Sequence, residues 1–201
     1  MTGLSPTKAT ADPASALQAI GLRHTLILMA CGGRKADTHG QAVPLVELYQ
    51  GPMWTTLRKH LGDAERLREL DARVLVLSGG LGFVSALTPA RPYEARLRPG
   101  AADSLIAGGI RAPSAGGLVP LQLMAPPSPD GAWRAVIAAG GSDYRRVFLS
   151  WIGELRACGA MTADALVLAT HGPIGKQRSQ LGGWLRILTP CGGKDHGTER
   201  P

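Results

Sequence analysis

The sequence predicts an α/β fold with a single, mostly parallel sheet flanked by helices. Short runs of branched apolar residues recur without alternation, as in Val74–Leu77, which is typical of strands buried on both faces. Each run stops at a glycine-rich turn, and most of these turns lead into a segment with apolar residues at helical spacing. This alternation predicts a parallel sheet covered by helices, with the turns meeting at one edge of the sheet.

Length and composition predict one domain. The 201 residues suit a single core, and an apolar content of 44% excludes disorder for most of the chain. We expect a flexible tail over residues 1–20, rich in Ala, Thr, Ser and Pro, and another over 190–201. The domain then spans 21–189, and its segment 111–131 is an irregular excursion dense in Pro and Gly.

The first half of the domain is predicted as a strand followed by helices. The apolar run Leu26–Ala30 predicts a buried strand over Thr25–Ala30. Pro44–Tyr49 suits a short helix, which Gly51 and Pro52 end. A longer helix is expected over Met53–Leu70, with apolar residues on one face and charges on the other.

The second half repeats the pattern. A short helix is expected over Asp103–Ile110, and strands are expected over Trp133–Ala139 and Ala165–Thr170. The helix between these strands has a suitable N-cap in Ser142 and a stop signal in Gly159. A last helix carries apolar residues at helical spacing, namely Leu181, Trp184, Leu185 and Leu188.

Charge and cysteine content narrow the possible partners and compartment. Lys and Arg number 22 against 15 Asp and Glu, and this net charge of +7 favours either an anionic partner or simply a basic surface. Aromatic residues make up only 4%, which argues against a single-strand binder built on stacking. Three cysteines without a CxxC pair predict neither disulfides nor a metal site. The absence of a signal-like start or a long apolar run predicts a cytoplasmic protein with no membrane partner.

The stretch from residue 73 to 94 is the expected centre of the binding site. Its strand ends in Ser78–Gly82, a turn whose backbone can approach a ligand closely. Ligands bind beyond the carboxyl ends of strands in open α/β sheets, so we expect Ser78, Gly79, Gly80 and Gly82 to line a pocket. Arg91, Tyr93 and Glu94 follow as a wall carrying a cation, a phenol and a carboxylate.

The turn after the first strand is a candidate anion site. Cys31, Gly32 and Gly33 lead into two cations, Arg34 and Lys35, which would bind phosphate or form a solvated basic turn. Cys31 is either a nucleophile with a pKa lowered by these cations or a small buried apolar residue. Neither this turn nor the turn at Ser78 has the spacing of a nucleotide-cofactor fingerprint, and we expect no cofactor.

The later turns contribute candidate catalytic groups. Asp143 lies between Ser142 and Tyr144, and a carboxylate beside a tyrosine at a strand end suits N-glycosidic chemistry. Glu94 is the other carboxylate in such a turn, and His171 is a candidate acid or base. The alternatives are helix capping for Asp143 and a structural role for His171. Lys176 belongs to Gly175–Arg178, either a phosphate site or an exposed basic helix start.

Several short motifs resemble those of a known family. Leu48–Gly51 resembles an LYxG motif, and Leu77–Gly82 with Pro92 and Tyr93 resembles LSxxxG followed by a PY pair. Gly141–Tyr144 is similar to a later SxxY-like turn. Together they resemble the YaaA family of peroxide-stress proteins and related phage and bacterial domains that open with a Cys-Ser-x-x-Lys turn, where this chain has Cys31–Gly33.

What the resemblance implies is the handling of nucleic acid or nucleotides. We therefore expect a nucleobase or nucleotide pocket at the strand ends, in a protein that removes or modifies bases. The alternatives are a non-catalytic DNA-binding protein of the oxidative-stress response and a plain interaction domain whose glycines serve only tight turns.

Overall fold

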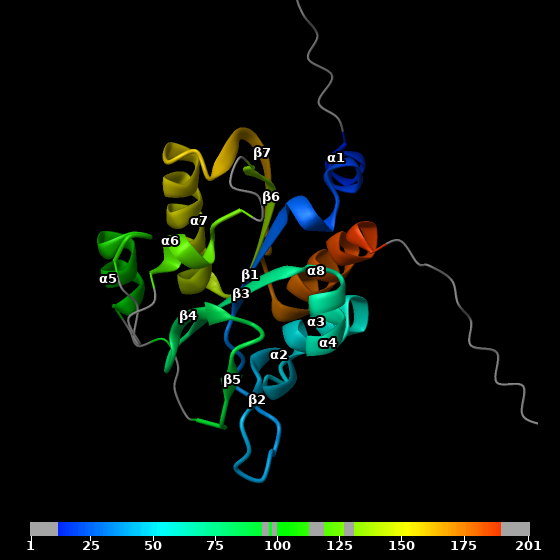
Figure 1. Ribbon diagram of the computed structural model, residues 1–201, viewed down its shortest axis with the longest axis vertical. Coiled ribbons are helices and arrows are strands. Elements are labelled where there is room, and N and C mark those ends of the chain that lie inside the picture. Colours follow the sequence, from blue (N-terminus) through cyan, green and yellow to red (C-terminus); the bar gives the residue numbers. More distant parts are fainter. Residues whose placement is uncertain (1–11, 94–96, 98–99, 113–118, 127–130, 190–201) are drawn as a thin grey trace, which may run out of the picture.

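The protein is a three-layer α/β/α structure, with helices on both faces of a central sheet (Figure 1). The computed structural model describes residues 12–93, 97, 100–112, 119–126 and 131–189. Within these residues the central sheet has the strand order β4-β3-β1-β6-β7, with bounds β1 Thr25–Ala30, β3 Arg73–Ser78, β4 Gly82–Ser85, β6 Trp133–Ala139 and β7 Met161–Ala169. Strands β1, β3, β6 and β7 are parallel, which confirms the predicted fold class.

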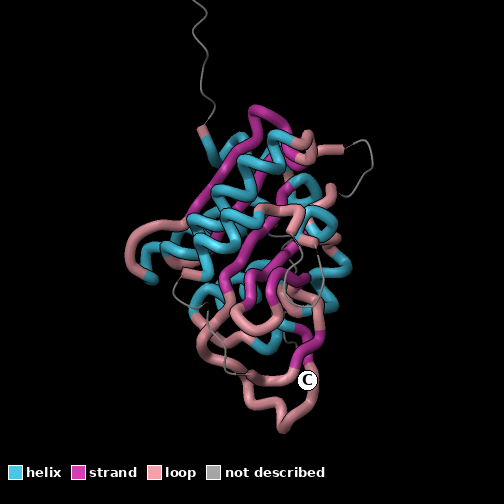
Figure 2. The backbone as a smooth tube through the Cα atoms, turned by 90° about the vertical axis from the view of Figure 1, so that its left-hand side faces the viewer, coloured by secondary structure: helices cyan, strands magenta, loops and turns pink. Residues whose placement is uncertain are grey.

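The helices segregate onto the two faces of the sheet. Helices α1 Pro13–Ile20, α3 Pro52–Leu61, α4 Ala64–Glu69 and α8 Ile174–Leu188 pack with the first core cluster, which includes Ile27 and Val76. Helices α5 Ala101–Gly108, α6 Pro120–Leu123 and α7 Ser142–Ala157 pack with the second, which includes Leu28 and Leu75. Side chains of one strand alternate between faces, so each apolar run supplies both cores. Figure 1 shows the strands between these two helical layers, and in the view of Figure 2 helices lie in front of the strands.

The turn after β3 is a hairpin. Four residues of β4 fold back antiparallel on β3, with Ser78 opposite Gly82, and Gly82 has a φ of 72° that favours glycine. The chain then reaches β5 Pro89–Ala90, which pairs with β2 Val43–Pro44 beyond the lower end of the sheet in Figure 1. The short helix α2 Leu45–Leu48 lies directly after β2.

Two predictions for the first half of the chain are wrong, a tail and a helix. The expected tail over residues 1–20 contains α1, in which Asp12 accepts a hydrogen bond from the Ser15 N–H and Leu17 is fully buried; residues 1–11 lie outside the described part. The helix expected over Met53–Leu70 is split into α3 and α4. Gly62 has a φ of 81° there, and Asp63 starts the next helix by accepting a bond from the Arg66 N–H.

Strand β7 and helix α7 also differ in detail from the prediction. The strand begins at Met161 rather than Ala165, because Met161 pairs with Trp133 ahead of a register shift in β6. Gly141, not Ser142, is the N-cap of α7, and no side chain of the described residues caps this helix start. The stop at Gly159 is confirmed by its φ of 79°. Of the excursion 111–131, only residues 111–112, 119–126 and 131 are described, and they include α6.

Candidate functional site

The topology singles out one place at the carboxyl edge of the sheet. Strand β1 has β3 on one side and β6 on the other, so the chain leaves the ends of β1 and β6 in opposite directions. Such a switch point opens a crevice between the two loops, and ligands of open α/β sheets bind there. The loops here are Cys31–Arg34 after β1 and Gly140–Gly141 after β6.

Two adjoining cavities occupy this crevice and share Cys31, Gly32, Gly33, Gly141 and Tyr144. One of about 240 Å³ has largely apolar walls, and its further lining residues are Ala30, Gly51, Pro52, Met53, Trp54, Ala139, Gly140, Ile174 and Gln177. The other, of about 360 Å³, is completed by Leu97, Ser142 and Asp143. The second cavity therefore lies against the first turn of α7, where the helix dipole places positive potential.

Gly140 allows the two loops to approach each other closely. A Cβ atom placed on Gly140 would lie 2.7 Å from the Cβ of Ala30 and 3.1 Å from the Cβ of Tyr144. Both neighbours are anchored close to their backbone, on β1 and α7, and neither can swing away. The crevice between β1 and β6 therefore depends on this glycine. Gly141, one residue later, has open space at the same position.

This contrast gives a matched stability test. We expect Gly140→Ala to lower the free energy of unfolding by about 1–3 kcal/mol, because overpacking forces the strand and helix apart. Gly141→Ala should change it by less than about 1 kcal/mol, since φ is −63° there and nothing lies within 4 Å. Urea unfolding of both variants measures the difference. Equal midpoints for the two would contradict the close approach.

Cys31 and Tyr144 form the polar contact of the shared wall. The Cys31 Sγ lies 3.0 Å from the Tyr144 hydroxyl, with either group able to donate. Burial raises the pKa of Tyr144 above its ordinary value, and its bond with Cys31 acts in the same direction. Tyr144 is therefore a neutral phenol at physiological pH, available to donate to a ligand or to the Cys31 sulfur. Cys31 itself is partly exposed in the crevice.

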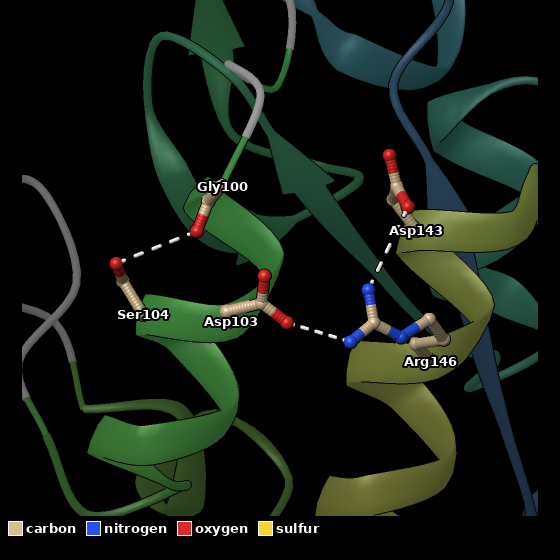
Figure 3. Close-up of polar contacts among 5 residues, drawn as sticks. All are labelled: Gly100, Asp103, Ser104, Asp143 and Arg146. Atoms are coloured by element: carbon tan, nitrogen blue, oxygen red, sulfur yellow. Dashed lines mark hydrogen bonds and ion pairs between the residues drawn. The ribbon is translucent and has the colours of Figure 1, made fainter.

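Asp143 faces solvent at the rim of the larger cavity. Its side chain is 62% exposed, and one oxygen lies 3.9 Å from the Arg146 Nη1. Figure 3 shows Arg146 between Asp143 and Asp103, and the Asp103 contact is the closer one, at 2.6 Å. Asp143 is thus loosely held and accessible, while Asp103 takes most of the interaction with the guanidinium.

A second polar cluster joins three segments beside the crevice. The hydroxyl of Tyr49 donates to the Ser78 Oγ over 3.4 Å, and the hydroxyl of Tyr93 makes short contacts with both. The Ser78 Oγ also accepts the N–H groups of Gly80 and Leu81 at 3.3 Å and 3.2 Å. We call Tyr49, Ser78 and Tyr93 the hydroxyl cluster. It brings together the LYxG, LSxxxG and PY motifs.

Lys35 completes this arrangement. Its Nζ lies 4.8 Å from the centre of the Tyr93 ring and 5.9 Å from that of Tyr49, within cation–π range of both. The placement follows from the backbone, because Lys35 pairs with Tyr49 in an isolated antiparallel bridge. The Gln50 N–H donates to the Arg34 carbonyl in the same stretch.

Arg58 of α3 fixes the position of Tyr49 by hydrogen bonds to the backbone around it. Its guanidinium donates to the carbonyls of Val46 and Tyr49 and to the Gln50 side chain. Burial lowers the pKa of Arg58 from its ordinary value, and the nearby carboxylate of Glu47 opposes this shift. Arg58 thus stabilises the end of α2 and holds Tyr49 at the site.

The hydroxyl cluster and the cavities are neighbours. Gly32, which lines both cavities, lies against Tyr49 and Trp54: a Cβ placed there would be 3.3 Å from the Tyr49 Cβ and 3.3 Å from the Trp54 Cδ1. The Trp54 indole donates to the Ala30 carbonyl at the end of β1. Burial raises the pKa of Tyr49, with smaller contributions in the same direction from Tyr93 and Cys31.

The structure divides the predicted site residues into groups. Six of them meet at the crevice, namely Cys31, Gly32, Gly33, Ser142, Asp143 and Tyr144. Lys35, Ser78 and Tyr93 meet at the hydroxyl cluster, beside a separate cavity lined in part by Gly80, Arg91 and Tyr93. Gly79 is exposed in the hairpin turn. Glu94 lies outside the described residues.

Three predicted residues lie on exposed surface instead of lining the crevice. Arg34 is exposed, and its backbone carbonyl accepts the Gln50 N–H. His171 is exposed and its ring contacts the Gln180 side chain at 3.0 Å. Lys176 is exposed in the first turn of α8. We expected the turns to meet at one edge of the sheet, but no described cavity is lined by all of Arg34, Lys35, Ser78, Tyr93, Asp143 and His171.

Other residues enter the site without a clear sequence signal. Tyr49 has only its place in the LYxG motif, and Trp54 is part of an amphipathic pattern. Gln177 is buried, donates to the Gly172 carbonyl, and lines the apolar cavity. A glutamine in a basic helix start gives no indication of burial. Ile174, 52% exposed at the same helix start, also lines that cavity.

Across the described residues, no group of three or more His, Cys, Asp or Glu side chains is arranged to hold a metal ion. No helix among them is long and apolar enough to cross a membrane. In comparisons with known proteins, no family model, no curated protein and no solved structure matches the chain, and the resemblance to the YaaA family stays a prediction.

Proposed function

We propose that this protein binds a nucleotide in the crevice between β1 and β6 and hydrolyses its N-glycosidic bond. The observation that carries the proposal is the pair of adjoining cavities at the switch point, one with apolar walls and one against a helix N-terminus. A nucleotide has the same division, with a flat apolar base at one end and an anionic phosphate at the other.

The base fits the cavity of about 240 Å³. Its walls include Pro52, Met53, Trp54 and Ile174, which offer apolar contact, while Gln177 and Tyr144 supply polar groups for the base edge. Ligand sites in proteins commonly combine mostly apolar walls with a few placed polar groups. A base that covers the half-exposed Ile174 would remove apolar surface from water.

The phosphate fits the cavity of about 360 Å³. Among the residues that the structure describes, no side chain caps the start of α7, so its first N–H groups are available to an anion at the positive end of the helix dipole. Ser142 adds a hydroxyl there. Arg34 does not line this cavity, but it directly follows Gly33, which does, and its exposed side chain is the cation that we expect to reach the phosphate.

Asp143 supplies the chemistry in this proposal. It lines the phosphate-side cavity and is open to solvent, so it can accept a proton from a water that attacks the anomeric carbon. The carbon–nitrogen bond breaks, its electron pair leaves with the base, and the base takes up a proton. The Tyr144 phenol, kept neutral by burial, is placed to donate that proton.

Binding is tested separately from turnover. Calorimetry with nucleosides and their monophosphates should give tighter binding for the phosphorylated member of each pair. Ile174→Gln should weaken nucleoside binding about fivefold. The exposed half of the Ile174 side chain is apolar surface that the base would cover, and glutamine replaces it with a polar amide. Leu149→Gln is the matched control, because Leu149 is the other exposed large apolar residue among those described and lies on α7 away from both cavities. If no nucleoside or nucleotide binds, the proposal is wrong.

The second candidate is a non-catalytic DNA-binding protein of the oxidative-stress response. The net charge of +7 and the exposed Arg34 and Lys176 support contact with a phosphate backbone. A cytoplasmic location belongs to either candidate, and the free thiols of Cys31 and Cys158 support it.

A further inference from the structure

A further groove lies at the opposite end of the sheet. It measures about 800 Å³, and the residues that line it include Gly21–His24, which directly precede β1, whereas Cys31 directly follows that strand. A six-residue strand separates the two ends by about 20 Å, so this groove is distinct from the nucleotide crevice. The remaining walls come from the ends of α1, α3 and α8 and from α4.

Cationic and basic side chains dominate the polar part of this groove. Arg23, His24, Lys59, His60 and Arg66 line it, against a single carboxylate, Glu69. Glu69 is already engaged, because its Oε2 lies 2.7 Å from the Arg66 Nη1. Arg23 and Lys59 are exposed, and within the described part of the chain neither has a carboxylate partner within 4.0 Å.

His60 lies close to two cations, Lys59 and Arg186. Burial lowers its pKa, and the charges of Lys59 and Arg186 lower it further. Its ring lies against α8, where a Cβ placed on Gly182 would be 3.5 Å from the Nε2. Two cations from different helices thus act on one imidazole, and the only carboxylate among the described lining residues is paired elsewhere.

The helix dipoles offset only part of this positive charge. Lys59, His60 and Arg186 lie in the last turns of α3 and α8, where cations complement the partial negative charge of the helix end. That partial charge is about half an elementary charge and fades within one turn, whereas each of these side chains except the histidine carries a full charge. Arg23 lies in the short 3-10 turn Leu22–His24 and adds to the excess.

We propose that this groove, lined by Arg23, Lys59 and His60, is a second anion site that binds phosphate groups of an oligophosphate or a single-stranded nucleic acid. Guanidinium, ammonium and imidazole groups around one concavity are the donors that phosphate oxygens require. The site is independent of the nucleotide crevice and would serve to hold an anionic partner at the amino edge of the sheet.

The test uses the full chain and two probes, inorganic tripolyphosphate and a ten-residue oligothymidylate. Binding of either probe should raise the pKa of His60, because a nearby anion stabilises the imidazolium. The NMR signals of the His60 ring, recorded against pH, measure this shift. The double substitution Arg23→Gln and Lys59→Gln should weaken binding roughly tenfold at low salt. For the oligonucleotide it should also reduce the slope of log K against log salt by about 0.7 for each phosphate that the variant no longer neutralises.

The matched control removes the same charge elsewhere. Arg68→Gln with Arg111→Gln changes two exposed cations that do not line the groove, and it should leave affinity within about twofold. Binding of tripolyphosphate alone would assign the site to free oligophosphates, and binding of both probes would assign it to a nucleic-acid strand. No binding, an unchanged His60 signal, or equal reductions in affinity for the control and groove variants would overturn the proposal.

Discussion

Asp143→Asn should leave the fold intact and lower the release of free base by at least about a hundredfold. Removing a general base typically costs a factor of about 10²–10⁴ in rate, because the proton of the attacking water then has no acceptor in the transition state. The stability cost is small by comparison. Asp143 is 62% exposed and its contact with Arg146 is long, so the substitution forfeits only about 0.3–1 kcal/mol of helix-dipole interaction.

Asp103→Asn is the matched control for this experiment. Asp103 binds the same guanidinium from α5, at 2.6 Å from the Arg146 Nη2, but does not line either crevice cavity (Figure 3). The substitution removes an equal charge from the same ion-pair network and should leave turnover unchanged. The readouts are melting temperature and release of free base from nucleotides and from DNA and RNA oligomers.

The outcomes separate the parts of the proposal. A wild-type protein that releases no base from any substrate has no glycosidase activity, and nucleotide binding then stands or falls on the calorimetry. Full activity in Asp143→Asn would transfer the catalytic role to another carboxylate, with Glu94 as the next candidate. Equal reductions of turnover in the Asp143 and Asp103 variants would indicate that Arg146, rather than the carboxylate, determines the rate.

The sheet could be predicted from sequence because its signals are local. Both Thr25–Ala30 and Trp133–Ala139 contain a run of five apolar residues, Leu26–Ala30 and Ala135–Ala139, and both predictions match the observed strands residue for residue. Their carboxyl ends meet for topological reasons, so the neighbourhood of Cys31 and Asp143 was also predictable. The hairpin strand β4 was not, because four residues after a glycine-rich turn carry the same signal as a ligand-binding loop.

The rest of the site depends on contacts between distant segments. Tyr49 and Ser78 are 29 residues apart, and Tyr49 and Tyr93 are 44 apart. Their contact requires the pairing of β2 with β5 and the anchoring of α2 by Arg58, neither of which has a local signature. The boundaries at Asp12 and Gly62, in contrast, do have local signals in the sequence. Both residues are ordinary caps, Asp12 at the start of α1 and Gly62 at the end of α3.

The hydroxyl cluster has a simple donor count. Since Tyr49 donates to Ser78, each hydroxyl donates once only if Ser78 donates to Tyr93 and Tyr93 to Tyr49. Every hydroxyl proton is then used inside the cluster, and a ligand could contact it only as a donor. We infer that its main role is to hold the segments carrying these residues together at the carboxyl edge of the sheet.

Ser78→Ala should therefore lower the free energy of unfolding by about 1–3 kcal/mol, because it leaves two phenols and two backbone N–H groups without their common partner. Ser85→Ala is the control: the hydroxyl of Ser85, on the adjacent strand β4, accepts the N–H of Leu87 in the following turn, and its removal should cost about 0.5–1 kcal/mol. A double-mutant cycle of Ser78→Ala with Tyr93→Phe, followed by urea unfolding, should give a coupling energy of about 0.5 kcal/mol or more. Additive effects in that cycle, or equal costs for the two serine variants, would show that the hydroxyls act separately and that the backbone alone holds the cluster together.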